Sequence, residues 1–450
     1  MISIVNALIV NEGRVFRGSL KIDGTVFVEV ASEGDDFVAE GEVVDAQGCY
    51  VLPGVIDEHV HFREPGLTQK ADIRSESRAA AAGGVTTFFD MPNTVPQTTT
   101  LAEFEQKRRL GAHNSLVNYA FYIGATNDNA EVLQQIDTTA IPAIKVFMGA
   151  STGNMLVEKE NALNNIFDIA ARRKLPIVAH CEDSALIARN EARVKSTVGQ
   201  DAPVEYHAVV RNEEVCLNST RKAIALASQS GAELLVAHVS TATELKEIAA
   251  AGKNINAEAC VAYTCFSSDN YASLGGRIKC NPAIKSEADR QYLRGALSRG
   301  EVLTVATDHA PHLLSDKQGG AFTATSGMPS VQFSLPLMLQ LVEEGVVDVP
   351  RVAELMCHNP ACYFGVVGRG FVRPGYKADL VLVRRTEKTH IIADADVVSK
   401  CGWTPYVGVP TNWRVETTLC NGTVVYQYDK GFVAPDYRGE AVEFKHEENS

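Results

Sequence analysis

The sequence of 450 residues lacks several features that mark particular classes of protein. Its ten cysteines include no Cys-x-x-Cys pair, which argues against a zinc knuckle or a thioredoxin-like site. No apolar run approaches the roughly 18 residues that a membrane span requires. The amino terminus, "MISIVNALIVNEGRV", has neither a basic lead nor a small-residue cleavage pattern. We therefore expect a cytoplasmic protein with free thiols, no signal peptide and no membrane partner.

Positive charge is also scarce. The chain has 42 Lys and Arg against 55 Asp and Glu, a formal net charge of −13, which argues against a nucleic-acid partner or an anionic membrane surface. A small anionic substrate remains compatible, because a local basic pocket can lie on an acidic protein. Hydrophobic residues make up 45%, which is enough for a large barrel and a smaller unit.

Both ends of the chain are rich in predicted strands. Alternating apolar residues and Gly or Asn turns occur in "SIVNALIV" and "SLKIDGTVFVEV", and again in "ADLVLVRR" and "WRVETTLCNGTVVYQ". We predict that residues 1–53 and 369–440 form one small β-sandwich domain. Residues 441–450 are expected to be a polar tail.

The middle of the chain, residues 54–368, alternates between apolar runs and helical stretches. Eight runs fit buried strands: "GVIDEHVHF", "GVTTFFDM", "LVNYAFYIG", "AIKVFMG", "PIVAHC", "ELLVAHV", "NINAEAC" and "VLTVATD". Near-continuous apolar runs are typical of parallel strands that are covered on both faces. The pattern predicts an α/β fold, a (β/α)8 barrel of the TIM type.

Ionisable residues interrupt these apolar runs at informative places. A lone histidine at a strand end is more often a core residue than a ligand, but His-x-His places two rings on the same side of a strand. The ends of parallel barrel strands meet at one mouth, and neutral imidazole and carboxylate are ligands of zinc and similar metals. Together the residues favour a metal site; they are His59, His61, Lys145, His180, His238 and Asp308.

Lys145 is the unusual member of this set. Its amine could reach solvent along its apolar stem, but "AIPAIKVFMG" offers few polar neighbours, and a buried ammonium without a partner is unfavourable. Metal cations would repel it. Addition of CO2 gives an anionic N6-carboxylated lysine with two oxygens, which we expect to bridge two divalent ions.

The motifs "DEHVHFREPG", "GGVTTFFDMPNT", "VAHCED", "VAHVST" and "ATDHAPH" resemble, in order, those of dihydroorotases, a family of cyclic amidohydrolases in the amidohydrolase superfamily. The resemblance implies a barrel, a flanking β-sandwich and a binuclear centre, usually zinc. It assigns one metal to His59, His61, carboxylated Lys145 and Asp308, and the other to Lys145, His180 and His238. Similar proteins are often homodimers or homotetramers.

The resemblance also assigns contacts to the substrate. A guanidinium can hold the carboxylate of dihydroorotate through two hydrogen bonds, although Arg63 could instead form a salt bridge with Glu64 or Asp72. The matching positions for substrate contacts are His61, Arg63, Asn93, Asn281, His312, Ser326 and Gly327.

The expected reaction is the reversible cyclisation of N-carbamoyl-L-aspartate to L-dihydroorotate and water in pyrimidine biosynthesis. A hydroxide activated by two metal ions is expected to attack the ring carbonyl, with Asp308 as general acid and base. The loop "ATSGMPSVQ" departs from the dihydroorotase pattern, so allantoinase and hydantoinase or dihydropyrimidinase remain alternatives, with a non-catalytic scaffold as a distant one. The loop "HLLSDKQGGAFTATSG" is either a lid or an ordinary surface loop.

Overall fold

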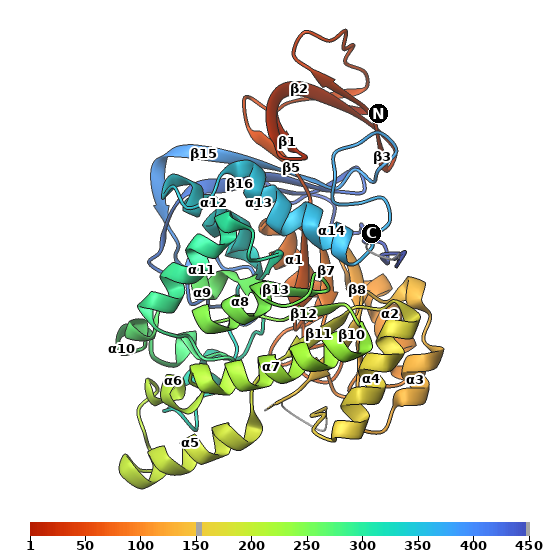
Figure 1. The fold of residues 1–450 in the computed structure, drawn as a ribbon. Helices are drawn as coiled ribbons and strands as arrows, with labels where there is room; N and C mark the ends of the chain where they lie inside the picture. The colour runs from red at the N-terminus through yellow and green to blue at the C-terminus, as the bar shows by residue number, and fades with distance from the viewer. Residues whose placement is uncertain (150–154, 447–450) are drawn as a thin grey trace.

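The computed structural model describes residues 1–149 and 155–446. A barrel forms the larger part of the molecule, and strands from both chain ends lie at one end of it, far from α5 (Figure 1). The strands are β1 (Ile2–Asn11), β2 (Arg14–Asp23), β3 (Val26–Ser32), β4 (Glu42–Asp45), β5 (Tyr50–Pro53), β6 (Val55–Val60), β7 (Val85–Asp90), β8 (Asn118–Phe121), β9 (Ile123–Gly124), β10 (Ile144–Phe147), β11 (Ile177–His180), β12 (Leu234–Val236), β13 (Ile255–Cys260), β14 (Thr304–Ala306), β15 (Leu380–Ile391), β16 (Pro410–Cys420), β17 (Thr423–Gln427) and β18 (Gly431–Phe432).

The predicted barrel is present, and its strands are parallel. One sheet has the order β6-β7-β8 and the other the order β14-β13-β12-β11-β10-β9. β8 and β9 are separated by one residue, so they act as one broken strand. The barrel closes where Val60, at the end of β6, forms a parallel bridge with His309, and the His61 amide donates to the His309 carbonyl at 2.7 Å. All eight apolar runs are therefore barrel strands.

Helices follow most of the barrel strands, as the pattern predicts. They are α1 (Ile73–Ala82), α2 (Leu101–Asn114), α3 (Ala130–Gln135), α4 (Glu160–Arg173), α5 (Ser184–Thr197), α6 (Tyr206–Val210), α7 (Glu213–Ser230), α8 (Ala242–Ala249), α9 (Val261–Cys265), α10 (Tyr271–Leu274), α11 (Glu287–Arg299), α12 (Ser334–Glu343), α13 (Val349–Ala353) and α14 (Asn359–Tyr363). Side chains cap the first amides of several of them; Asp72 and Ser75, for example, form a capping box at α1.

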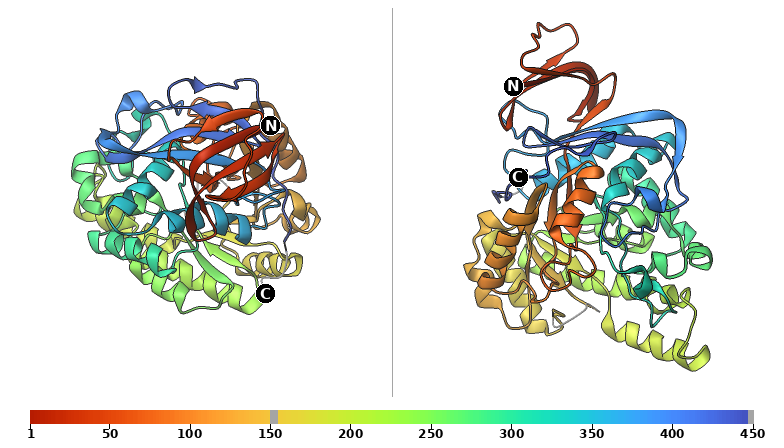
Figure 2. Two further views of the ribbon diagram at one scale, coloured as in Figure 1. Left: turned by 90° about the horizontal axis from the view of Figure 1, so that it is seen from above. Right: turned by 180° about the vertical axis from the view of Figure 1, so that it is seen from behind.

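The smaller domain combines both chain ends, as the sequence predicts. Its sheet has the order β18-β17-β16-β15-β5-β1-β2-β3, with β4 beside β1, so N-terminal and C-terminal strands pair directly. Ile9 and Leu20 share one apolar core with Leu380 and Leu419. Both views of Figure 2 show the red N-terminal strands next to the blue C-terminal strands. Neither end of the chain supplies the whole of this sheet by itself.

The C-terminal segment differs from the expected polar tail. Val442 and Phe444 are 4% and 2% exposed, and the Val442 amide donates to the Tyr119 carbonyl at 3.0 Å. The Phe444 ring lies 5.4 Å from the Phe89 ring. Alternating apolar residues thus extend the packing of this segment to residue 446, and residues 447–450 lie outside the described part.

In the described part of the chain, no helix has both the length and the apolar character needed to cross a membrane.

Candidate metal and substrate site

The four predicted histidine ligands form a row of neighbouring rings at the ends of β6, β11 and β12. The ring centroids are 5.5 Å apart for His61 and His59, 5.1 Å for His59 and His238, and 4.8 Å for His238 and His180. Burial lowers the pKa of both His59 and His238 well below the ordinary value. The charge of Lys145 adds to this effect at His59, and that of His180 adds to it at His238. Neutral rings offer the lone pair that a metal needs.

Asp308 joins this row at the end of β14. Its Oδ1 lies 2.9 Å from Nε2 of His61 and 3.5 Å from Nε2 of His59. One ligand atom from each of these three residues fits within 4.8 Å of the others. Burial alone would raise the pKa of Asp308, but its contact with the His61 ring and the charge of Lys145 lower it below the ordinary value. Asp308 is therefore a carboxylate facing two imidazoles.

Lys145 lies on β10 beneath the same cluster. Its side chain is fully buried, and its Nζ has no hydrogen-bond partner among the described residues. Burial lowers the pKa of this amine to about 8, although Glu258 and Asp308 act in the opposite direction. A lone buried amine beside imidazoles and carboxylates is costly as an ammonium. It is chemically suited to carboxylation, because CO2 adds to a neutral amine.

The donor set fits a pair of divalent cations. His59, His61 and Asp308 gather on one side, whereas Nδ1 of His180 and Nε2 of His238 face each other at 3.0 Å. The set also includes the buried Nζ of Lys145, which has no hydrogen-bond partner among the described residues. Imidazole and carboxylate are the ligands that zinc and related ions prefer.

Two buried glutamates, which the sequence reasoning missed, orient the histidine rings. Glu258 on β13 accepts from Nδ1 of His59 at 2.8 Å and from the backbone amide of His238 at 2.9 Å. Glu182 lies 2.9 Å from Nε2 of His180 and forms an ion pair with Arg211. Such carboxylates fix the ring orientation of metal ligands. A single acid inside the apolar run "NINAEAC" was the available signal for Glu258.

Three of the eight non-glycine residues with positive φ in the described structure belong to the site. Arg63, His238 and Asp308 have φ values of 71°, 41° and 48°, in the left-handed region that side chains other than glycine rarely adopt. Strained residues persist where the surrounding structure holds them, often at functional sites. The strain here falls on two predicted metal ligands and on the predicted carboxylate-binding arginine.

Arg63 and His312 form a unit beside the cluster. Arg63 donates from Nε to the Pro311 carbonyl at 3.0 Å and from Nη2 to Nε2 of His312 at 3.0 Å. Glu64 and Asp72, the alternative partners, bind elsewhere: Glu64 accepts from the Ile73 amide, and Asp72 pairs with Lys400. Within the described residues Arg63 has no carboxylate partner. Burial lowers its pKa to about 10, so the guanidinium is still charged near neutral pH.

The other predicted substrate residues line the same cavity with different groups. Oδ1 of Asn93 lies 2.7 Å from Nδ1 of His61, so that the amide nitrogen of Asn93 is left as a donor. Oδ1 of Asn281 is buried without a partner in the described structure. The amide of Gly327 donates to the Lys279 carbonyl at 2.8 Å, so this amide is already in use. The lack of a side chain at Gly327 instead allows a close approach to the Ala310 backbone, because a Cβ there would lie 2.8 Å from the Ala310 carbonyl oxygen.

A cavity of about 590 Å³ joins these groups. Every predicted site residue except Lys145 lines it, including Ser326 on the loop after Asp308. A volume of this size is within the usual range for a small-molecule site.

Comparison with known proteins decides the family. The sequence model of the protein family described as "Amidohydrolase family" matches residues 50–425 of this chain. The chain belongs to the amidohydrolase family. It is 34% identical to a dihydroorotase of Halobacterium salinarum, covering 92% of this chain and 97% of that protein. It is 30% identical to an allantoinase of Bacillus velezensis, covering 94% and 93%. The solved L-hydantoinase (dihydropyrimidinase) of Arthrobacter aurescens has a TM-score of 0.89 at 26% identity, covering 98% and 97%.

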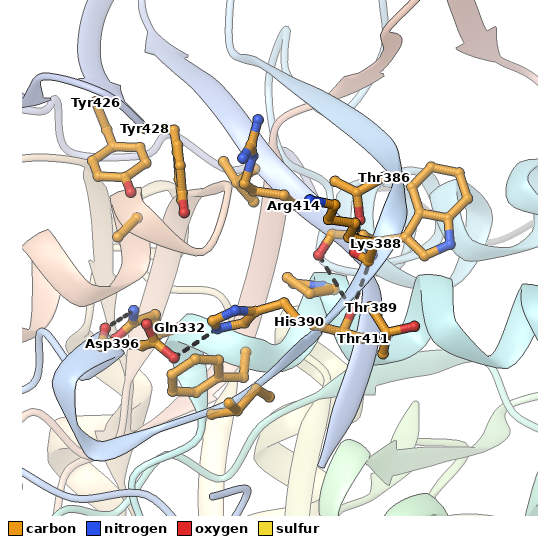
Figure 3. Close-up of a pocket in the computed structure, with 16 residues that line it drawn as sticks. Gln332, Thr386, Lys388, Thr389, His390, Asp396, Thr411, Arg414, Tyr426 and Tyr428 are labelled. Carbon is orange, nitrogen blue, oxygen red and sulfur yellow. Dashed lines mark hydrogen bonds and ion pairs between the residues drawn. The ribbon is translucent and has the colours of Figure 1, made fainter. Parts of the chain in front are cut away.

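This amidohydrolase has a second cavity, of about 440 Å³, between α12 and the β15–β16 hairpin (Figure 3). Two of its charged or titratable groups have partners: His390 lies 2.7 Å from Asp396, and Arg414 pairs with Glu416 outside the lining. None of the predicted site residues lines it. We therefore assign the chemistry to the cavity at the strand ends.

Proposed function

We propose that the chain is a dihydroorotase, which interconverts N-carbamoyl-L-aspartate and L-dihydroorotate with loss or gain of water. The observation that carries the proposal is the Arg63–His312 unit beside the histidine cluster, a buried guanidinium without a protein carboxylate in the described structure. A ring substrate that carries a carboxylate complements it. Relatives named dihydroorotase, at 31–34% identity over 85–93% of this chain, support the same function.

We assign one metal ion to His59, His61, carboxylated Lys145 and Asp308. The second is assigned to Lys145, His180 and His238, and both ions are expected to be zinc. When bound, such ions supply Lewis-acid activation of water and of the ring carbonyl.

The residues of the chain have separable roles. Asp308 takes the proton of the attacking water and delivers it to the ring nitrogen that leaves, and the reverse transfers serve cyclisation. Arg63 holds the substrate carboxylate. His312 accepts from Arg63 through Nε2, so its Nδ1 carries the hydrogen and is left as a donor to the same carboxylate. Asn93 and Asn281 provide amide groups for the polar edge of the ring. Fixing both ends of the ring orients its carbonyl toward the histidine cluster.

Turnover assays test this proposal directly. The protein is expected to hydrolyse L-dihydroorotate and to cyclise N-carbamoyl-L-aspartate, with far lower kcat/KM for allantoin and hydantoin, and to contain about two metal ions per chain. Preference for allantoin or hydantoin would make it one of the other cyclic amidohydrolases. Absence of both metal and turnover would favour a non-catalytic scaffold.

The remaining expectations concern the whole protein. We propose a homodimer or homotetramer in the cytoplasm. We also propose a division into a composite domain of residues 1–53 and 369–440 and a barrel of residues 54–368. Gel filtration with light scattering tests the assembly.

A further inference from the structure

Lys317 is a buried lysine that the proposed chemistry does not use. Its side chain is on the loop after Asp308, and the residue is only 3% exposed. Its Nζ donates to three backbone carbonyls, those of Lys279 at 2.9 Å and of Thr325 and Gly327 at 2.6 Å each. An ammonium has three donors, so these carbonyls satisfy it without a carboxylate.

The three carbonyls belong to two segments that are far apart in the sequence. The first segment contains Lys279, two residues before Asn281. The second contains Thr325 and Gly327, which flank Ser326. Asn281, Ser326 and Gly327 all line the cavity at the strand ends. The Gly327 amide also donates to the Lys279 carbonyl at 2.8 Å, so Lys317 reinforces an existing junction between the segments.

This junction contacts the Arg63–His312 unit. A Cβ on Gly327 would lie only 3.0 Å from Cδ2 of His312, so the loop packs on that imidazole. Trp403 supports the same place from the smaller domain: its Nε1 donates to the His312 carbonyl at 2.8 Å, and Nζ of Lys317 lies 5.8 Å from the centroid of its ring. Movement of the junction would therefore displace His312.

We propose that Lys317 is a positioning residue for substrate recognition, which joins the Lys279–Asn281 and Thr325–Gly327 segments and thereby fixes His312 at the carboxylate-binding end of the cavity. The inference rests on the proposed function for its substrate, but the junction itself exists without substrate. Because Lys317 touches no predicted metal ligand, its removal should affect binding more than the chemical step.

The test compares Lys317→Met with Lys388→Met, which removes a lysine from the wall of the other cavity. For Lys317→Met we expect the KM for L-dihydroorotate to rise about tenfold or more, with kcat within about threefold of wild type and unchanged metal content. Hydrogen exchange at the Gly327 and Thr325 amides should accelerate about tenfold, while exchange in β11 stays unchanged. Lys388→Met should match wild type in all three measurements.

The possible results distinguish a failure of the role assigned to Lys317 from a failure of the proposed function. Unchanged KM or unchanged exchange at Gly327 in folded Lys317→Met overturns the inference, as does an equal acceleration of exchange in β11, which indicates general destabilisation. If Lys317→Met fails to fold, Lys317→Gln, which keeps two N–H donors, should give an intermediate KM and intermediate local exchange; wild-type values would overturn the inference. If the wild-type protein does not turn over dihydroorotate, the proposed function fails, and the exchange experiment still tests the junction.

Discussion

Replacement of Arg63 by methionine tests the carboxylate assignment most sharply. Of the five N–H groups of a guanidinium, two are occupied by Pro311 and His312, which leaves three for a ligand. A charge-assisted hydrogen bond contributes about 1.5–3 kcal/mol, so a bidentate contact contributes about 3–6 kcal/mol. At about 1.4 kcal/mol per factor of ten, kcat/KM for L-dihydroorotate should fall roughly 10²–10⁴-fold, mainly through KM.

Steady-state kinetics in both directions measure this effect. Arg63→Lys is the matched control, because it keeps the charge but loses the planar fork, and it should show an intermediate loss. A slow substrate without the carboxylate, such as hydantoin, should be much less affected by either change. An unchanged KM for dihydroorotate, or an equal loss with hydantoin, would refute the assigned role of Arg63.

Three further predictions concern the metal ligands and the barrel wall. Lys145→Ala should lose metal and turnover together by metal analysis and assay, with partial rescue by a short carboxylic acid; two bound ions and normal turnover would contradict the bridge. Asp308→Asn should lower kcat by about 10²–10⁴-fold with a smaller change in KM; kcat close to wild type would exclude Asp308 from proton transfer. Glu76 lies 2.8 Å from Nε2 of His309, and although burial raises its pKa, hydrogen bonds from His309, Ser399 and Ser75 lower it below 4.5. Its contribution to stability is therefore present above pH 4.5 and lost as pH falls through the lowered pKa. Glu76→Gln should reduce the free energy of unfolding at pH 7 by about 1–3 kcal/mol and flatten its acid dependence, as measured by denaturant unfolding at several pH values; an unchanged pH profile would count against this assignment.

The barrel was predictable because its strands are encoded locally. Each apolar run, such as "PIVAHC", has the length and composition of a buried strand, and the helical stretches between the runs predict parallel order. The composite domain was also predictable from its two β-rich ends. The C-terminal segment was not, because Val442 and Phe444 alternate with polar residues in a short stretch, and only the folded chain brings β8 and the Phe89 ring beside them.

For the site, the sequence by itself determined which side chains stand at the strand ends. His59 and His61 share a side because strand residues alternate, and Asp308 comes two residues after the last strand, so barrel closure brings it to them. The tertiary structure alone decided what holds these groups in place: the contact of Glu258 with His59 across 199 residues, the bond from Trp403 to His312, and the three carbonyls around Lys317. Strand periodicity can be recognised from neighbouring residues in the sequence. These contacts instead depend on the closed barrel and on loop conformations that no local pattern specifies.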